Sequence, residues 1–285
     1  MPTLYIVGTP IGNLEDLTPR AARILSEVSL VAAEDTRVTR RLLSHLGIHP
    51  RTTSFHQHNW RNKLDGLLAE LAEGDVALVT DAGMPVVSDP GNELVAAAAR
   101  AGIKIEVVPG PSAVTAALAM SGFAGDAFSF LGFLPRRRKD RQSALREASS
   151  SVVPLVIFEA PHRLRATLAD MDTVLGGRPL AVCRELTKLH EEVFRGTAFQ
   201  ALEHFDSPRG EVVLVVQGRP IEASSSPEAT AEGDAATDTE LRRQLIGLRE
   251  DGIRAKEAVA MVAEAMGLPK NRVYQVWVDV GRKPR

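Results

Sequence analysis

VALVTDAGMPVVSDPG, residues 76–91, is the stretch of sequence that decides the fold. Its first four residues are apolar and predict a buried strand. The strand ends at residues 80–83, TDAG, where small side chains let a ligand approach the backbone, and turn signals follow at Pro85 and at residues 89–91. In an open α/β sheet, ligands bind at the carboxyl ends of the strands, where such loops lie. The stretch therefore predicts either one wall of a ligand pocket or an ordinary strand-to-helix loop.

The composition is that of an ordinary globular protein. The 285 residues suggest about two domains, and 44% of them are apolar, which is enough for a substantial core. The net charge of −2 does not by itself indicate a nucleic-acid partner. The single cysteine, Cys183, excludes an intramolecular disulfide and a multi-cysteine metal site, and it is typical of a reducing compartment. Because the N-terminus has neither a charged leader nor a long apolar span, we expect a cytoplasmic protein that does not contact a membrane.

Outward from the opening stretch, the chain repeats one pattern of apolar strand, loop and helix. In the first half the predicted strands are residues 3–7, 29–33, 76–79 and 104–108. This order predicts a mostly parallel sheet covered by helices. In the second half, where more hairpin-like pairing is expected, the predicted strands are residues 128–133, 152–158, 179–184, 192–196 and 211–217. The fold class is therefore α/β, with two α/β domains.

The domain boundaries follow from the same pattern. We expect a first domain at residues 1–121 and a second at 122–219. Residues 220–238 are rich in Ser, Pro, Ala, Glu and Asp and predict a disordered acidic linker. Residues 239–285 predict a small helical module.

Several familiar catalytic signatures are absent. The segment from Gly8 to Asn13 has neither the Gly-Lys-Ser/Thr of a P-loop nor the third glycine of a dinucleotide fingerprint. The sequence has no HExxH and no GxSxG. His56 and His58 lack a third ligand, so a solvated loop is favoured and no metal site is expected.

What remains is a set of loops at strand ends with small or kinked residues. Such loops suit a folded, partly apolar cofactor held mainly by backbone N–H and C=O groups. They suit a triphosphate poorly, because few Lys or Arg residues lie among them. The loops are GTP (8–10), DAGMP (81–85), PGPS (109–112), FEAP (158–161), ELTK (185–188) and RGE (209–211).

Read in order, seven motifs resemble the tetrapyrrole-methylase-fold superfamily of S-adenosylmethionine-dependent methyltransferases. Each motif alone is weak, but the ordered series is specific and covers residues 4–217. Within the superfamily the chain is most similar to members that methylate a ribose 2′-hydroxyl of small-subunit ribosomal RNA. The tail from residue 239 resembles the helix-turn-helix-like appendage of the same members, whereas the acidic linker matches nothing. The motifs are LYIVGTPIGNLEDLTPRA (4–21), AEDTR (33–37), TDAGMPVVSDPG (80–91), VPGPSAVTAAL (108–118), FLGFLPR (130–136), FEAPHR (158–163) and RELTKLHEE (184–192).

The resemblance implies two α/β domains of the tetrapyrrole methylase fold with S-adenosylmethionine in the cleft between them, a C-terminal helix-turn-helix-like module, and a homodimer. It also implies that the substrate is a decoding-centre cytidine of 16S ribosomal RNA, on the small ribosomal subunit. Carried over onto this sequence, the cofactor-binding positions are Pro10, Asp81, Ala82, Gly83, Met84, Ser112, Ala113, Phe158, Leu186 and Gly210.

Transfer of a sulfonium methyl group to a ribose oxygen needs in-line placement of the two groups and a base that removes the hydroxyl proton. We consider Asp81, Glu159, Glu34 and His162 as that base, and Lys188 as a group that stabilises charge developing on oxygen. Each of two candidates has an equally weighted structural alternative. Glu159 can form an ion pair with Arg163, and the segment EDTR (34–37) can simply start a helix. The base therefore stays open.

Three functions compete: a ribosomal RNA ribose methyltransferase, a tetrapyrrole (precorrin-type) small-molecule methyltransferase on the same fold, and a non-enzymatic RNA-binding module. Five cations in six residues favour RNA, because a small pigment needs no such run for phosphate contacts. A solvated charged loop is the plain alternative. The cofactor loops, which carry no charged insertions, argue against the non-enzymatic function. The cations are Arg136, Arg137, Arg138, Lys139 and Arg141.

Overall fold

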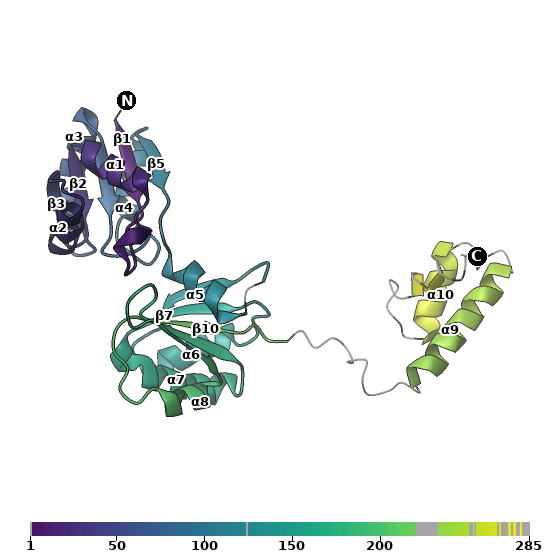
Figure 1. Ribbon diagram of the computed structural model, residues 1–285. Helices are drawn as coiled ribbons and strands as arrows, with labels where there is room; N and C mark the ends of the chain where they lie inside the picture. The colour runs from purple at the N-terminus through teal and green to yellow at the C-terminus, as the bar shows by residue number, and fades with distance from the viewer. Residues whose placement is uncertain are drawn as a thin grey trace. The chain divides into compact units, whose positions relative to one another are not determined.

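In the computed structural model the chain forms two compact units, Met1–Arg219 and Pro220–Arg285 (Figure 1). Among the described residues, no helix is both long and apolar enough to cross a lipid bilayer. The residues that the structure describes are 2–123, 125–220, 233–250, 253, 255–266, 268, 273–274, 276–277 and 280.

The first sheet of unit 1 is parallel throughout, with strand order β3-β2-β4-β1-β5. Its strands are β1 (Thr3–Val7), β2 (Leu30–Ala33), β3 (Arg51–Ser54), β4 (Val76–Val79) and β5 (Lys104–Val108). Apolar side chains of helices α1 (Pro19–Glu27) and α2 (Thr36–His45) form the core on one face. Those of α3 (Trp60–Glu73) and α4 (Asn92–Arg100) form the core on the other. The predicted helix-covered parallel sheet is confirmed.

The second sheet is mixed, with order β6-β7-β10-β8-β9. Only β6 and β7 pair in parallel, and the other neighbours are antiparallel, so the expected hairpin-like pairing is confirmed. Helices α6 (Arg138–Ala148), α7 (Pro161–Leu175) and α8 (Ala198–His204) cover one face. The strands are β6 (Ser129–Phe133), β7 (Leu155–Glu159), β8 (Leu180–Arg184), β9 (Glu192–Gly196) and β10 (Val212–Val216).

Helix α5 (Ala113–Ser121) covers the opposite face of this second sheet, although the sequence pattern assigns it to the first domain. Val114, Ala117 and Leu118 pack against β7, β8 and β10, and the Sγ of Cys183 lies 3.8 Å from the carbonyl oxygen of Ala117. The boundary predicted at residues 121 and 122 therefore falls on the wrong side of α5. Because α5 is apolar and rich in alanine, its sequence does not show which of two sheets it covers.

Two helices of unit 1 begin with residues that are typical of helix N-termini. The side chain of Thr18 accepts a hydrogen bond from the N–H of Ala21, and Pro19 occupies the first turn of α1. Pro161 likewise occupies the first turn of α7, but its N-cap residue, Ala160, makes no side-chain hydrogen bond. Both helices follow loops at the sheet edges where the candidate site forms.

Two elements of unit 1 escaped sequence interpretation. Strand β3 is polar and half-exposed because it lies at the sheet edge beside β2 alone. Helix α6 begins inside the run predicted as a basic loop, and it buries Arg141 as well as Leu145. A charged residue in a buried position is not expected from hydrophobic periodicity, so the helix is hidden from that pattern.

The second unit contains α9 (Gly233–Glu250) and α10 (Ala255–Met266) around its own apolar core. Leu241, Leu245, Val262 and Trp277 belong to that core, and the Arg249 guanidinium lies 5.1 Å from the centre of the Trp277 ring. The helical module is confirmed, but α9 begins six residues earlier than the predicted start at residue 239. The linker prediction is thus wrong for residues 233–238, and residues 221–232 lie outside the described residues.

Candidate functional site

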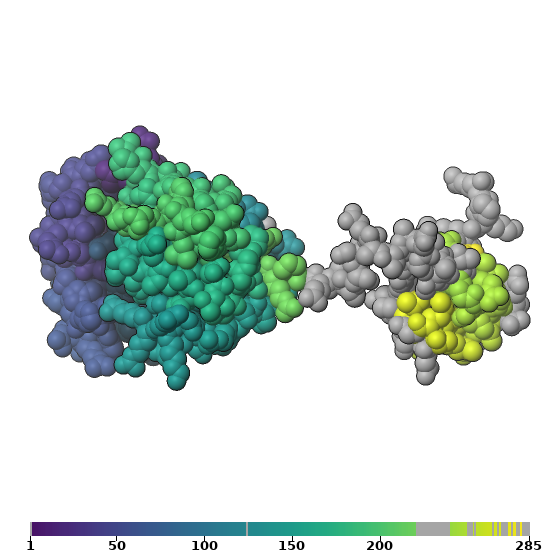
Figure 2. Space-filling view, turned by 90° about the horizontal axis from the view of Figure 1, so that it is seen from below, coloured from purple at the N-terminus to yellow at the C-terminus, as the bar shows by residue number. Residues whose placement is uncertain are grey.

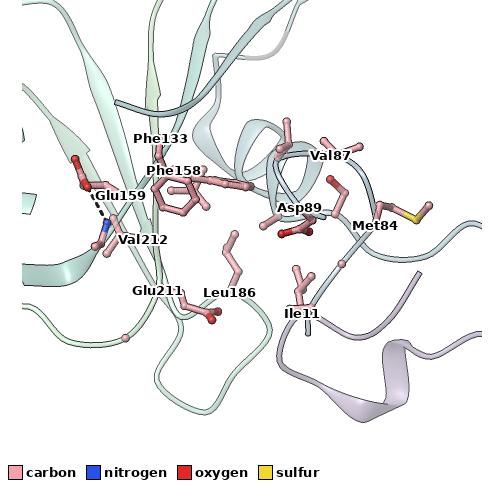
Figure 3. A pocket seen from close by; sticks show the side chains of 18 of the residues that line it. Ile11, Met84, Val87, Asp89, Phe133, Phe158, Glu159, Leu186, Glu211 and Val212 are labelled. Carbon is pink, nitrogen blue, oxygen red and sulfur yellow. Dashed lines mark hydrogen bonds between the residues drawn. The ribbon is translucent and has the colours of Figure 1, made fainter. Parts of the chain in front are cut away.

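The main cavity of unit 1 lies where the loops of the first sheet meet the second sheet (Figures 2 and 3). Its volume is about 370 Å³, within the range of small-molecule sites. Figure 3 shows Ile11, Val87 and Asp89 on one side of it, facing Phe158 and Leu186 on the other.

The first wall of the cavity is built by close approach of three backbone segments after β1, β4 and β5. Thr9 and Gly83 exchange both N–H···O=C hydrogen bonds, at 2.9 and 3.1 Å. A Cβ on Gly8 would lie 2.7 Å from the backbone nitrogen of Gly110, so only glycine fits there. Gly83 itself has a φ of +79°, a conformation that costs glycine little. The sequence predicted that these small residues let a ligand approach the backbone. In the structure they also let the three loops approach one another closely.

The second wall is apolar and comes from β6, β7 and the loop after β8. The Phe158 ring makes edge contacts with Phe130 and Phe133, with ring centres 4.9 and 5.6 Å apart. Leu186 lies between Glu185 and Thr187, whose φ angles are +53° and +66°. These left-handed conformations are strained for residues with side chains. The strain is concentrated in the loop that presents Leu186 to the cavity.

Asp89 is the one carboxyl group that the first wall gives to the cavity, and it was absent from the predicted site. Figure 3 shows it pointing toward Phe158 and Leu186. Burial raises the pKa of Asp89 to about 7, and the neighbouring charges of Glu34 and Asp81 add to the effect. The sequence DPG at 89–91 was interpreted only as a turn signal. The feature that could have identified Asp89 is its position as a carboxylate close in sequence to the small-residue loop TDAG at 80–83.

The structure brings together most of the residues predicted to bind the cofactor, and assignment of that role remains a prediction. Two of the ten do not border the main cavity. Pro10 and Asp81 instead line a neighbouring cavity of about 190 Å³. The residues that do line the main cavity are Ala82, Gly83, Met84, Ser112, Ala113, Phe158, Leu186 and Gly210.

Among the predicted catalytic residues, Glu159 lies at the cavity but is held by its neighbours. It is 2% exposed. Its Oε1 lies 3.2 Å from the Arg163 Nε and accepts the N–H of Ala160, while the Thr167 hydroxyl donates to its Oε2. The structural alternative of a Glu159–Arg163 ion pair is therefore present. A carboxylate with these partners orders the start of α7.

Glu34 and Asp81 are linked at the ends of β2 and β4. A Glu34 carboxylate oxygen accepts the N–H of Asp81 at 3.3 Å, and an Asp81 carboxylate oxygen accepts the N–H of Asp35 at 3.0 Å. Burial is the main cause of the raised pKa of both Glu34 and Asp81. Asp35 behaves differently, because hydrogen bonds from Arg37 lower its pKa to about 2. The alternative of an acidic helix start neutralised by Arg37 therefore applies to Asp35 alone.

Lys188 and His162 lie apart from these acids. The Lys188 Nζ contacts Glu185 at 2.8 Å and Glu211 at 2.9 Å. Burial lowers the pKa of Lys188, but these two carboxylates outweigh it and leave the pKa raised. His162 borders a wide groove beyond Phe133. Neither residue lines the main cavity.

The basic run divides into an exposed part and a buried part. Arg141 is 5% exposed, and its guanidinium contacts Asp170 at 2.6 Å and the carbonyl oxygen of Arg136 at 3.2 Å. Arg141 is therefore wrongly placed in the predicted RNA-binding set, because its charge is used inside the fold. Arg138 also reaches Asp170 but remains largely exposed. Arg136, Arg137 and Lys139 are exposed.

A search of the described residues finds no group of three His, Cys, Asp or Glu side chains placed to hold a metal ion. The His56 and His58 rings meet edge to face, and the N–H of His58 donates to the His56 Nδ1 at 3.2 Å. This pair is accounted for as a loop contact.

Comparison with known proteins gives a consistent result. Residues 3–202 match the model of the tetrapyrrole (corrin/porphyrin) methylases, and residues 235–277 match that of the RsmI C-terminal HTH domain. The "ribosomal RNA small subunit methyltransferase I" of Halalkalibacterium halodurans is 43% identical over 96% of this chain and 94% of its own length. The proteins of the same name from Thermotoga maritima and Escherichia coli O157:H7 are 48% and 40% identical, over 77% and 95% of this chain and 100% and 93% of theirs.

Solved structures show the same fold at lower identity. A uroporphyrin-III-C-methyltransferase from Thermus thermophilus is 24% identical with a TM-score of 0.54, and covers 76% of this chain and 94% of its own. The cobalt precorrin-4 methyltransferase CbiF is 18% identical with a TM-score of 0.56, over 75% and 94%.

Proposed function

Because this chain belongs to the tetrapyrrole (corrin/porphyrin) methylase family, in its ribosomal RNA small subunit methyltransferase I branch, we propose that it methylates 16S ribosomal RNA. The methyl donor is S-adenosylmethionine. The acceptor is the ribose 2′-hydroxyl of a decoding-centre cytidine, presented on the small ribosomal subunit.

One observation carries this proposal over a small-molecule function on the same fold. Phe133 and Ala160 border both the main cavity and an adjoining groove of about 890 Å³. Arg136, Arg138 and His162 line that groove. A methyl-donor site in the main cavity, next to a groove lined by cations, suits an RNA strand, because cations bind the phosphates of RNA.

The main cavity fits the proposed cofactor. Apolar residues from both walls suit a planar adenine, and Asp89 supplies negative charge opposite a sulfonium and an ammonium group. Gly210 lines the cavity with a φ of +81°, and a Cβ there would overlap the Glu185 side chain, so this position of the cavity wall requires glycine. The residues that would hold the cofactor are Ile11, Gly83, Asp89, Ala113, Phe158, Leu186 and Gly210.

When bound, S-adenosylmethionine supplies a methyl group that its sulfonium has already activated. The protein's contribution is then to hold the two reactants in line and to accept one proton. Of the four predicted bases, Glu34 and Asp81 have no ion-pair partner within 4 Å among the described residues and have raised pKa values, which favours proton acceptance near neutral pH. We therefore propose that the linked pair Glu34 and Asp81 accepts the proton. Glu159 instead has the role of ordering the start of α7.

The tetrapyrrole alternative rests on the names of the solved structures that share the fold. We further propose a cytoplasmic homodimer in which the second unit contacts the ribosomal subunit. Sedimentation equilibrium of the intact chain tests the dimer.

The test is mass spectrometry of 16S ribosomal RNA from small subunits treated with protein and S-adenosylmethionine. A 2′-O-methyl group blocks alkaline cleavage at its own nucleotide, so one new alkali-resistant position is expected. Gly83→Val is the matched inactive control, since it places a branched side chain at φ +79° in the Thr9–Gly83 bridge. A new methyl on a base, or methylation of a tetrapyrrole in place of RNA, would overturn the proposal.

A further inference from the structure

A second cavity shares a wall with the main one. It lies across the Thr9–Gly83 bridge, so neighbouring residues in the loops after β1 and β4 border different cavities. Ile11 and Ala82 border the main cavity, whereas Pro10 and Asp81 border the second. Its volume of about 190 Å³ is half that of the main cavity. It has room for a single-ring base and not for a second molecule of cofactor size.

An unused hydrogen-bonding group lines this cavity. Thr39 on α2 is 3% exposed, and its Oγ1 has no hydrogen-bond partner among the described residues. A buried hydroxyl without a partner is costly, and such groups in native proteins call for an explanation. A ligand that supplies the missing bond is that explanation.

The rest of the lining suits a flat, partly polar ring. Leu14 and Val38 are apolar yet 45% and 36% exposed, and both border the cavity. Asp81 supplies a carboxylate that lacks an ion-pair partner within 4 Å in the described part of the chain. Arg41 is exposed at the same cavity and is placed to meet a phosphate.

We propose that this cavity receives the cytosine base of the target nucleotide, unstacked from the RNA. The Asp81 carboxylate accepts a hydrogen bond from the exocyclic amine, and the Thr39 hydroxyl completes the polar contacts of the ring. Carboxylates are the side chains that accept from this amine of cytosine. Uracil presents an oxygen at the same place, which a carboxylate repels. Enzymes that act on a nucleotide read an unstacked base in this manner, with polar contacts to its edge and apolar contacts to its faces.

The proposal rests on the proposed function, and it explains why the ribose reaches the donor. A base held in the second cavity places its sugar beside the wall that both cavities share. Asp81 then contacts the base, which leaves Glu34, hydrogen-bonded to the Asp81 N–H, as the member of the linked pair that accepts the proton.

The first experiment fills the cavity. Val38→Phe adds bulk at a partly exposed position, so the protein should fold. We expect its rate of methylation on small ribosomal subunits to fall at least about 30-fold, while its affinity for S-adenosylmethionine, measured by calorimetry, stays within about twofold. Ser44→Phe places the same phenyl ring at an exposed position of the same helix, outside the cavity, and should act as wild type.

The second experiment tests base reading. Asp81→Asn keeps an oxygen that can accept the Asp35 N–H but removes the charge. Wild-type protein should prefer subunits with cytidine over uridine at the target by about 10- to 100-fold. Asp81→Asn should reduce this preference about tenfold, and Thr39→Val should lower kcat/KM about three- to tenfold.

The outcomes separate the two proposals. If wild-type protein methylates no RNA, the proposed function fails. If it does, but Val38→Phe methylates normally or Asp81→Asn keeps the full preference for cytidine, the base-reading cavity alone is wrong. Loss of cofactor binding in a folded Val38→Phe protein would also overturn it, because the cavity would then belong to the cofactor site.

Discussion

The acidic residues around the site differ between the two halves of unit 1. In the second half, Glu159 and Glu211 line the main cavity and Glu185 lies beside Glu211. A cation holds each of them: Arg163 contacts Glu159, and Lys188 contacts Glu185 and Glu211. In the first half, Glu34, Asp81 and Asp89 have no cation within 4 Å among the described residues, and burial raises the pKa of all three.

This difference separates structural charge from charge available to a ligand. Paired acids of the second half lie beside Phe158 at the end of β7 and Leu186 in the loop after β8, so that half contributes an apolar wall. The carboxylates of the first half are partly buried without a cation, which costs free energy. A cationic cofactor or the amine of a base can offset this cost. Groups whose pKa values are perturbed in this way are found preferentially at functional sites.

The largest effect is expected at the most buried pair. Asp170 is 1% exposed and contacts Arg141, Arg138 and Gln142. Burial raises its pKa, but the hydrogen bonds from these side chains outweigh burial and the pKa is lowered. Asp170→Ala should lower the free energy of unfolding by about 3–5 kcal/mol, since it leaves the Arg141 charge buried. Chemical denaturation measures this decrease in the free energy of unfolding. A decrease below about 1 kcal/mol would contradict the view that acids paired with cations stabilise the fold.

The next largest effect concerns Asp89. Asp89→Asn should weaken S-adenosylmethionine binding about 10- to 100-fold, because it removes a charged hydrogen-bonding partner, without loss of folded stability. Glu211→Gln is the matched control. Glu211 lines the same cavity but is exposed and paired with Lys188, so binding should weaken less than about threefold. Calorimetry on both variants decides, and equal losses would contradict the comparison.

A smaller effect is expected for the exposed cations. Changing Arg136, Arg137 and Lys139 to Gln should weaken RNA binding and reduce the slope of log affinity against log salt by about 0.7 for each lost contact. Binding titrations at several salt concentrations measure the slope.

The control for that experiment uses exposed cations that acids already hold. Arg20, Arg23 and Arg51 pair with Glu106, Glu27 and Glu70, and their replacement by Gln should leave the slope unchanged. The same decrease in both triple variants would mean that RNA responds to net charge alone.

The smallest effect is the pH dependence of stability. Because the pKa of Asp89 is raised from 3.8 to about 7 in the folded protein, the folded state retains a proton that the unfolded chain has lost between these values. Stability contributed by this group is therefore greatest at low pH and decreases as pH rises to about 7. Asp89→Asn should gain a few degrees in melting temperature relative to wild type between pH 5 and pH 8. If the difference in melting temperature between the two proteins is the same at pH 5 and pH 8, the pKa of Asp89 is not raised in the folded protein.

The sequence predicted many of the loop residues that line the main cavity, because their signals are local. A buried strand followed by TDAG at 80–83, or by PGPS at 109–112, places small residues at a sheet edge whatever the rest of the chain does. Asp89 escaped because nothing near it in sequence tells a carboxylate that turns into a cavity from one that caps a turn. Arg141 was misassigned because its partner, Asp170, lies 29 residues away.

By itself the sequence determined the α/β class, the parallel first sheet and the family, because strand periodicity and ordered motifs are properties of neighbouring residues. Only the tertiary structure decided which sheet α5 covers, which acids are paired, and that Ala82 and Asp81 border different cavities. These depend on contacts between residues distant in the chain, and adjacent side chains of an extended segment point in opposite directions. A shift of one residue therefore moves a group from one cavity to the other.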